Sequence, residues 1–352
     1  MSTVKEPLFG KSKDELTQLS TDLGLPAYTG GQLAYWLYKT DVDSFDLMTN
    51  ISKKTRALIS EHYVLGINPP VSVKESVDGT KKYLFNAGNG KFIEAAYIPD
   101  GKRHTLCVSS QVGCKMGCLF CMTGKQGFQG QLSPGEILNQ LRSIPERALV
   151  TNIVYMGMGE PFDNLQSVMK SSAILTAEYG FAISVRKVTV STIGIIPAMK
   201  VFLEESKCNL AVSLHTPFED ERRKLMPVQN VYPIKEVIDT ITKYDIGKYR
   251  RVSIEYIMFK DVNDTRRHVN ELARLLNKVN CRINLIRFHS IPGTPLESSS
   301  EETILDFQKA LNAKGIVTTL RASRGQDIEA ACGLLSTKEL VKKKKDSNLI
   351  TE

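Results

Sequence analysis

The sequence lacks long apolar runs. No stretch reaches the roughly 18 apolar residues that a membrane-spanning helix needs, so we expect no membrane span. The amino-terminal residues MSTVKEPLFGKSKDEL contain no apolar segment of the kind found in secretory signals. Both absences favour a cytoplasmic protein, in which cysteine thiols stay reduced.

The cysteines lack the even number and regular spacing of a disulfide framework. There are seven, and four of them crowd into CVSSQVGCKMGCLFC, residues 107–121. Such crowding in a reducing compartment indicates metal or redox chemistry. Cys208 and Cys281 match no motif, and we interpret both as inert thiols.

Negative charge is in deficit. The 352 residues include 46 Lys and Arg against 38 Asp and Glu, which gives a net charge of +8 and a pI of about 9.0. The surplus indicates either a solvated lysine-rich surface or a polyanionic partner such as nucleic acid. The KKKK run at 342–345 belongs to an expected basic tail that attracts phosphates without specificity.

The chain has no internal repeat and no long linker, and its pattern changes near residue 71. Residues 13–65 show apolar residues at helical spacing and no strand pattern, with Gly30 and Gly31 expected to form a turn between two helices. The stretch KKYLFNAGNGKFIEAAYIPDGKRHTLCVSS then predicts three strands joined by a Gly-Asn-Gly turn and an Asp-Gly turn.

After the cysteine cluster, strand and helix patterns alternate. Expected strands are 152–157, 186–192, 209–215, 251–259, 283–288 and 316–321. Helix starts are expected at Ser133 with Glu136, and at Asp163 with Gln166, because both pairs have the spacing of a capping box. The alternation predicts an α/β fold with a parallel sheet of about six βα units, whose functional groups lie at the carboxyl ends of the strands.

The spacing C-x3-C-x2-C at Cys114, Cys118 and Cys121 indicates a metal centre. Structural zinc uses four ligands, often in two separated pairs, and no second pair is present. Three cysteines can instead hold three irons of a [4Fe–4S] cluster and leave the fourth iron open to a substrate. A zinc knuckle that uses Cys107 as its fourth ligand is the alternative.

This spacing, placed after the first strand of a parallel α/β chain, resembles the radical S-adenosylmethionine (SAM) superfamily. One subgroup is similar over roughly residues 20–335, namely the RNA adenine methyltransferases that act on 23S ribosomal RNA. The similar motifs are TLCVSSQVGCKMGCLFC, GFQGQLSPGEI, MGMGEPFDN, VTVSTIG, AVSLHTP and RGQDIEAACG. The resemblance implies a partial (β/α)6 barrel, a small amino-terminal helical accessory domain, one [4Fe–4S] cluster with an open iron, and two SAM molecules per turnover.

With this resemblance, the sequence divides into four expected parts. Residues 1–70 form the helical accessory domain, 71–106 form a β extension, 107–335 form the radical SAM core, and 336–352 form a basic tail.

The resemblance also implies SAM contacts at several strand ends. They are Gly159, Glu160, Ser191, Ser213, Leu214, His215 and His289, with Phe120 near the SAM adenine. Taken alone, a Gly-rich turn with a carboxylate is common, strand-end serines are ordinary, and Phe120 could be a loop anchor. His289 is a departure, because the family commonly has Asn there, although His also makes a hydrogen bond.

Cys332, Cys107 and Glu94 are the expected catalytic residues by resemblance. Cys332, expected on a short helix, carries the methyl group, and Cys107 resolves a covalent protein–RNA adduct by forming a transient disulfide with Cys332. Glu94 is the proton acceptor. In isolation, Cys332 reads as a small buried side chain and Glu94 as an exposed strand residue.

The implied activity is methylation of C2 of an adenine in 23S rRNA at the peptidyl-transferase centre, and of the adenine 3′ of the anticodon in some tRNAs. Expected partners are these RNAs, an electron donor such as flavodoxin and a thiol reductant, with a monomeric protein. The alternatives are C8 methylation of the same rRNA adenine and a non-catalytic zinc-binding RNA-associated protein. Basic residues expected near phosphates are Lys53, Lys54, Arg56, Arg103, Arg222, Arg223 and Lys224.

Overall fold

The computed structural model describes residues 5–246 and 250–337. Its centre is a ten-stranded sheet with the strand order β14-β13-β12-β11-β10-β9-β6-β5-β4-β3. Strands β6 to β14 in that order are parallel, and β5, β4 and β3 continue the sheet in antiparallel fashion. The bounds are β3 (Ser72–Glu75), β4 (Lys81–Asn86), β5 (Phe92–Asp100), β6 (Arg103–Cys107), β9 (Asn152–Tyr155), β10 (Val188–Thr192), β11 (Asn209–Ser213), β12 (Val252–Met258), β13 (Cys281–Arg287) and β14 (Thr318–Leu320).

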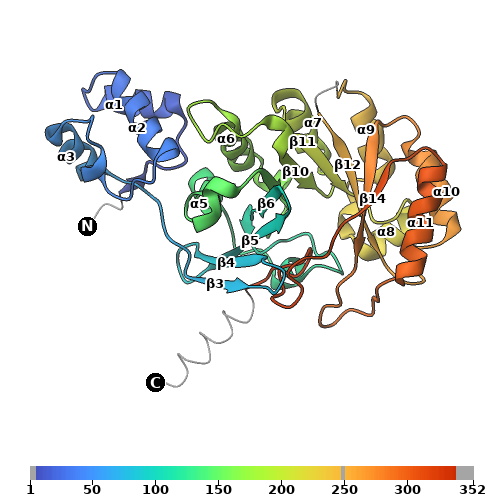
Figure 1. The fold of residues 1–352 in the computed structure, drawn as a ribbon. Helices are drawn as coiled ribbons and strands as arrows, with labels where there is room; N and C mark the ends of the chain where they lie inside the picture. Colours follow the sequence, from blue (N-terminus) through green and yellow to red (C-terminus); the bar gives the residue numbers. More distant parts are fainter. Residues whose placement is uncertain (1–4, 247–249, 338–352) are drawn as a thin grey trace.

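Helices follow most of the parallel strands and lie against the sheet (Figure 1). They are α4 (Met122–Gln126), α5 (Pro134–Arg142), α6 (Leu165–Thr176), α7 (Ile196–Glu205), α8 (Glu219–Leu225), α9 (Ile234–Thr242), α10 (Arg266–Leu276) and α11 (Glu301–Ala313). The face of the parallel strands that packs in the core beneath the helices is apolar, and every residue of β12 is buried. The expected α/β class, the strands and the partial barrel are confirmed. Within the described residues, no helix has both the length and the apolar character needed to cross a membrane.

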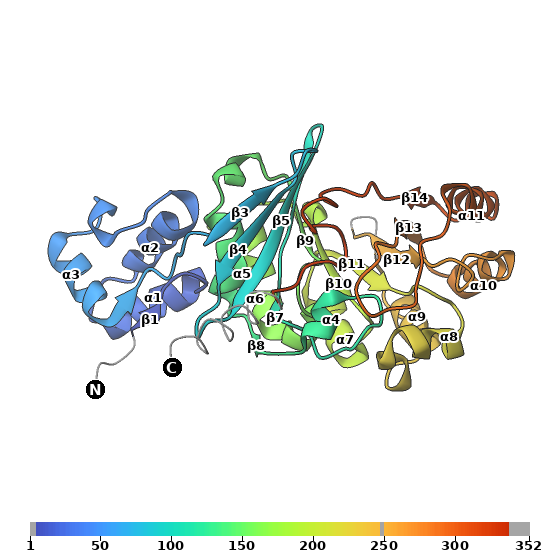
Figure 2. The same ribbon diagram turned by 90° about the horizontal axis from the view of Figure 1, so that it is seen from below.

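Helices α1 (Lys13–Asp22), α2 (Tyr28–Lys39) and α3 (Lys53–His62) form a lobe at one end of the molecule, opposite α10 and α11 (Figures 1 and 2). The predicted turn at Gly30 and Gly31 is wrong, because both residues lie inside α2. A Cβ on Gly30 would stand 2.4 Å from the Cα of Thr17 in α1, so this glycine permits close helix packing. The lobe also contains a short parallel pair, β1 (Glu6–Pro7) and β2 (Tyr63–Val64), which the helical pattern did not indicate.

The two expected capping boxes have different outcomes. Ser133 and Glu136 form one at the start of α5, with Pro134 in the first turn. The expectation for Asp163 is wrong, because α6 has Asn164 at its N-cap without a side-chain cap. The Asp163 carboxylate instead accepts from Gln111 at 2.8 Å and pairs with Lys115 at 2.7 Å.

Residues 321–337 return across the barrel after β14. Gln126 in α4 accepts from the Thr337 N–H at 3.0 Å, and Asp327 accepts from Ser76 next to β3. The segment contains turns, so the short helix expected around Cys332 is wrong. The KKKK run and residues 338–352 of the expected tail lie outside the described residues.

Candidate active site

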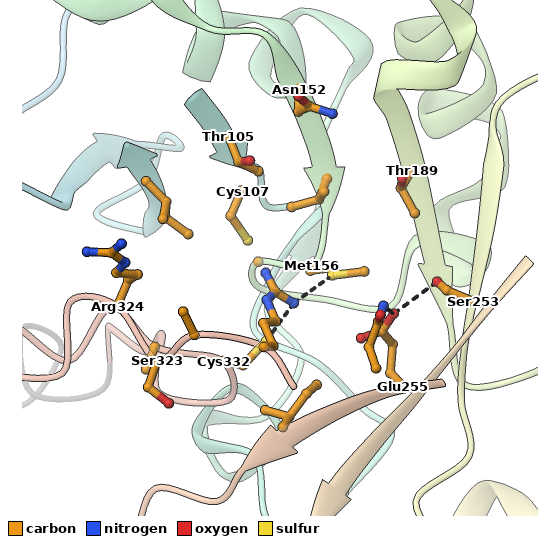
Figure 3. Close-up of a pocket in the computed structure, with 18 of the residues that line it drawn as sticks. Thr105, Cys107, Asn152, Met156, Thr189, Ser253, Glu255, Ser323, Arg324 and Cys332 are labelled. Atoms are coloured by element: carbon orange, nitrogen blue, oxygen red, sulfur yellow. Dashed lines mark hydrogen bonds between the residues drawn. The ribbon is translucent and has the colours of Figure 1, made fainter. Parts of the chain in front are cut away.

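The inside of the curved sheet encloses a cavity of about 690 Å³. Side chains from β5 at one side and β14 at the other line this same cavity, which requires the sheet to curl into a partial barrel. Among the expected site residues, those in the lining are Cys107, Cys121, Cys332 and His289, together with Arg103 of the expected phosphate contacts. Figure 3 shows Cys107 and Cys332 at the cavity although they are far apart in the sequence.

Cys107 is the last residue of β6 and is buried. It pairs with Ala96 of β5, and its side chain packs with Val154 and Ala330. Burial raises the pKa of the Cys107 thiol to about 12, with a smaller rise from Cys332. The thiol therefore stays protonated near neutral pH until a partner activates it.

Main-chain contacts with α4 hold Cys332 in place. The Met122 N–H donates to the Gly333 carbonyl at 2.9 Å, and the Thr123 hydroxyl donates to the Leu335 carbonyl at 2.6 Å. Arg321, which follows β14, donates to the Cys332 Sγ at 3.7 Å and to the Met156 Sδ at 3.4 Å. These contacts place Cys332 between the cysteine loop and the barrel interior.

Cys114, Cys118 and Cys121 lie on the loop that leads into α4, with Cys121 as the N-cap residue. Burial raises the pKa of Cys118 well above its usual range, and the nearby Cys121 and Cys114 raise it further. The three thiols are thus neighbours, with Cys114 and Cys118 buried and Cys121 partly buried. Their number, type and proximity fit an iron–sulfur cluster, in which each thiolate binds a different iron.

The zinc alternative needs Cys107 beside these three thiols. The burial and electrostatics of Cys107 involve Cys332 and Arg321, and Cys107 packs in a separate apolar cluster from Cys118. In residues 5–246 and 250–337, no three His, Cys, Asp or Glu side chains converge on one metal ion, and this includes Cys114, Cys118 and Cys121, which in a cluster would each bind a separate iron. Cys107 and Cys332 share the cavity lining and influence each other electrostatically, although Cys332 itself packs against the apolar cluster of Cys118.

Gly159 and Glu160 follow β9. Gly159 has a φ of +102°, and a Cβ there would stand 2.6 Å from the Gln111 Cβ, so the turn requires glycine. The buried Glu160 carboxylate accepts from the N–H groups of Phe162 and Ile193, both at 3.1 Å. Burial raises its pKa to about 7. Glu160 also raises the pKa of Cys114 and Cys118, so it lies close to the cysteine loop.

The next strand ends carry the other expected SAM contacts. Ser191 belongs to β10, and Ser213 ends β11. Leu214 is fully buried. These residues share the carboxyl edge of the sheet with Glu160, although neither they nor Gly159 and Glu160 line the cavity.

His215 follows with a φ of 60°, and its Nδ1 accepts from the Ile257 N–H at 3.0 Å. Burial lowers the pKa of His215 to about 3, and Arg222 lowers it further, so the ring is neutral. Phe120 stands edge-on to this ring with centroids 4.7 Å apart and also packs on Phe259. Phe120 thus anchors the cysteine loop to the ends of β11 and β12.

His289 lies in the cavity wall after β13. Its Nε2 is 3.1 Å from the Ser323 hydroxyl oxygen. Burial lowers the pKa of His289, so its neutral ring can accept or donate one hydrogen bond.

Glu94 is in β5 and is buried, so its reading as an exposed strand residue is wrong. Its carboxylate pairs with Lys82 at 3.2 Å and accepts from the Ser336 N–H at 3.0 Å. Burial raises its pKa in spite of these partners. Glu94 lies on the same face of the sheet as Cys107 but does not line the cavity, because the returning carboxyl-terminal segment binds it.

Arg222 was expected to face RNA phosphates, and this expectation is wrong. It is fully buried in α8, where it donates to Gln229 at 2.9 Å and to the Ile193 carbonyl at 2.8 Å. Burial lowers its pKa to about 10, while Cys118 raises it. Arg222 is therefore a buried cation beside the cysteine loop.

Sequence reasoning missed most of the polar residues of the cavity wall, among them Glu255, Asn284 and Arg321. A signal existed for Glu255, because polar Ser253 and Glu255 alternate with apolar residues in a strand that is buried throughout. Such alternation in a buried parallel strand indicates a polar interior facing one side.

Comparisons with known proteins agree with this architecture. The model of the radical SAM superfamily matches residues 108–276, and the model of the ribosomal RNA large subunit methyltransferase N-terminal domain matches residues 7–65. A Parabacteroides distasonis protein described as a probable dual-specificity RNA methyltransferase RlmN is 53% identical over 95% of this chain and 97% of its own length. The dual-specificity RNA methyltransferase RlmN of Desulfotalea psychrophila is 41% identical over 94% of this chain and 95% of its own length.

A solved structure is also similar. The crystal structure of a radical SAM methyltransferase from Sphaerobacter thermophilus has a TM-score of 0.88 and 39% sequence identity. The match covers 94% of this chain and 99% of that one, so the lobe and the barrel are both included.

Proposed function

The chain belongs to the RlmN family of dual-specificity RNA methyltransferases within the radical SAM superfamily, and on this premise we propose that it methylates C2 of an adenine in 23S rRNA and in tRNA. Membership of the superfamily implies a [4Fe–4S] cluster and SAM. One observation carries the proposal: Cys107 and Cys332 face one cavity that also has Cys121 in its lining. A thiol pair beside a cluster loop suits a reaction that needs both a nucleophile and a radical.

Cys114, Cys118 and Cys121 would hold the cluster and leave one iron open for SAM. Gly159, Glu160, Ser191, Ser213, Leu214, His215 and His289 would bind SAM along the carboxyl edge of the sheet. Bound together, the two groups supply a methyl group and, from a second SAM, a 5′-deoxyadenosyl radical. The raised pKa of Glu160 fits a carboxylate that awaits the SAM ammonium group.

The cysteines of the protein perform the remaining steps. C2 of adenine is electron-poor, so it cannot attack SAM directly, and the Cys332 sulfur takes the methyl group first. That methyl group would lose a hydrogen atom to the 5′-deoxyadenosyl radical, and the remaining carbon radical would add to C2 and join Cys332 to the RNA. The adduct would then lose one electron, to the oxidised cluster, and the ring proton, to a base. Cys107 would attack the Cys332 sulfur and break the sulfur–carbon bond, the freed carbon would take a proton, and a thiol reductant must reopen the disulfide that forms.

Glu94 is our proposed acceptor for the ring proton. Its burial raises the carboxyl pKa, which suits a general base near neutral pH. Its partners Lys82 and the Ser336 N–H fix it on the Cys107 face of the sheet. RNA entry would therefore have to displace the segment that now covers it.

We propose that the enzyme works as a monomer in the cytoplasm with an electron donor such as flavodoxin. Residues 1–70 would be an RNA-binding accessory domain, 71–106 a β extension, 107–335 the catalytic core, and 336–352 a basic tail. Lys53 and Lys54, exposed at the start of α3, are suited to phosphate contacts.

The test is anaerobic. The reconstituted protein is given SAM, a reductant and a 23S rRNA fragment or tRNA, and the digested nucleosides are compared with standards by mass spectrometry. 2-Methyladenosine in both RNAs is expected. 8-Methyladenosine would replace the C2 assignment by C8 chemistry at the same site, and colourless protein that contains zinc alone after anaerobic preparation would refute the enzyme proposal.

A further inference from the structure

The cavity wall holds a buried carboxylate of which only one oxygen is satisfied. Glu255 in β12 is 3% exposed. Its Oε1 accepts from the Asn284 Nδ2 at 2.8 Å and from the Ser253 hydroxyl at 3.0 Å. Its Oε2 has no hydrogen-bond partner among the described residues. A buried acceptor without a donor is costly, so its retention at a cavity points to a donor on a ligand.

Neighbouring strands fix the direction of this carboxylate. Asn284 in β13 is itself oriented, because its Oδ1 accepts from the Thr319 hydroxyl of β14 at 2.8 Å. The register places Asn284 opposite both Glu255 and Thr319. Three adjacent strands therefore hold Oε1, and the carboxylate cannot turn Oε2 away without losing two hydrogen bonds.

Arg321 lies close to both the Glu255 carboxylate and the Cys332 thiol. It donates to the Cys332 Sγ at 3.7 Å. Its pKa is raised mainly by Cys332 and to a smaller extent by Glu255 and Cys107, so all three lie near the guanidinium. Figure 3 shows Cys332 and Glu255 at the wall of the same cavity. The wall thus presents a sulfur, a donor and an acceptor.

The Watson–Crick edge of adenine carries matching groups in the same order. C2–H comes first, then N1, which accepts a hydrogen bond, and then the 6-amino group, which donates. We propose that Glu255 accepts from the 6-amino group of the target adenine and Arg321 donates to N1, which directs C2 toward Cys332. The proposal rests on the proposed function and names the base contacts of its substrate.

The same contacts reject the other purine. Guanine carries the acceptor O6 at the position where Glu255 needs a donor. Its N1–H is a donor at the position where Arg321 needs an acceptor. It also carries an amino group on C2 itself. Like groups would face one another at both positions, and buried polar groups left without partners give strong discrimination.

The experiment compares RNAs with adenosine or purine riboside, which lacks the 6-amino group, at the target position. We measure kcat/KM for methylation by the cluster-loaded wild-type enzyme, Glu255→Gln and Ser253→Ala. The wild type should prefer adenosine by roughly 10- to 100-fold, since purine leaves Oε2 unpaired. Glu255→Gln should lose most of this preference. Ser253 and Asn284 would donate to its single side-chain oxygen, so no acceptor would remain for the 6-amino group. Ser253→Ala should keep it, because Oε2 is unchanged.

A second pair of measurements addresses Arg321. Replacing adenosine by 1-deazaadenosine, which lacks N1, should lower wild-type kcat/KM by roughly tenfold and should have little effect on Arg321→Met. Wild-type preferences under threefold for both analogues would overturn the proposal, and this outcome needs no variant to fold. A preference for adenosine that persists in Glu255→Gln would also overturn it. Failure of the wild type to methylate the adenosine RNA at all would instead refute the proposed function.

Discussion

The Met122 N–H donates to the Gly333 carbonyl at 2.9 Å, which joins the residue after Cys121 to the residue after Cys332. The proximity of the cysteine loop to Cys332, the proposed methyl carrier, therefore depends on a main-chain hydrogen bond. Thr123 adds a hydrogen bond to the Leu335 carbonyl. A change confined to the Cys332 side chain should leave this junction, and with it the cluster loop, in place.

Cys332→Ala tests this separation. The variant should retain its iron and reductive cleavage of SAM but lose RNA methylation by more than a thousandfold, because the methyl carrier is gone. Iron content, 5′-deoxyadenosine release and nucleoside mass spectrometry measure the three properties. Cys281→Ala is the matched control, since Cys281 begins β13 away from the cavity lining and should leave all three unchanged. Full methylation by Cys332→Ala would contradict its role.

Cys107→Ala tests the resolving thiol. Without Cys107, the adduct between Cys332 and RNA cannot be released, so the protein should retain RNA through a denaturing gel. Nuclease treatment should remove the shifted band, and Cys107→Ala combined with Cys332→Ala should not form it. Release of free, methylated RNA by the single variant would count against the assignment.

Local patterns in the sequence predicted the strands of the sheet well and the contacts of the buried polar side chains poorly. Each expected strand from 152 onward overlaps an observed one, because the buried parallel strands are rich in apolar residues. The α5 capping box was also predictable, because Ser133 and Glu136 satisfy each other across one turn. These signals are local, so a single sequence contains them.

The errors involve partners that are distant in the sequence. Asp163 has capping chemistry but is bound by Gln111 and Lys115. Arg222 resembles a surface cation in the sequence, yet it is buried near Cys118 and donates hydrogen bonds to buried acceptors such as the Ile193 carbonyl. The Glu255 carboxylate is oriented by a hydrogen bond from Asn284 of the next strand. No spacing rule identifies such partners, whereas the family motifs alone predicted roles for Cys107 and Cys332.

His215 should make stability depend on acid pH. Its pKa falls from 6.5 to about 3 on folding through burial, so the unfolded chain takes up a proton below pH 6.5 and the folded chain does not. The stabilisation is complete above pH 6.5 and decreases as the pH falls, by about 2–3 kcal/mol at pH 4.5. Urea unfolding of the cluster-free protein at pH 7.5 and 4.5 measures it. His215→Asn, which tolerates the positive φ, should lack this part of the pH dependence. Parallel pH profiles for wild type and variant would contradict the assignment.

Two adjacent glycines in α2 provide a matched test of packing in the amino-terminal lobe. A methyl group on Gly30 would meet the Thr17 backbone at 2.4 Å, whereas one on Gly31 would find only the Lys13 Cε at 3.8 Å. Gly30→Ala should therefore destabilise the lobe by about 1–3 kcal/mol, because α1 must move. Gly31→Ala should stabilise it by roughly 0.5–1 kcal/mol, since alanine is the better helix former.

Trp36 makes this measurement specific, because it is the one tryptophan of the chain and lies in α2. Its fluorescence during urea unfolding reports the lobe that both substitutions affect. Equal effects of the two substitutions would show that α1 and α2 are not in close contact at Gly30. Opposite effects would establish that this glycine serves helix packing, and that the pattern of two successive glycines does not mark a turn here.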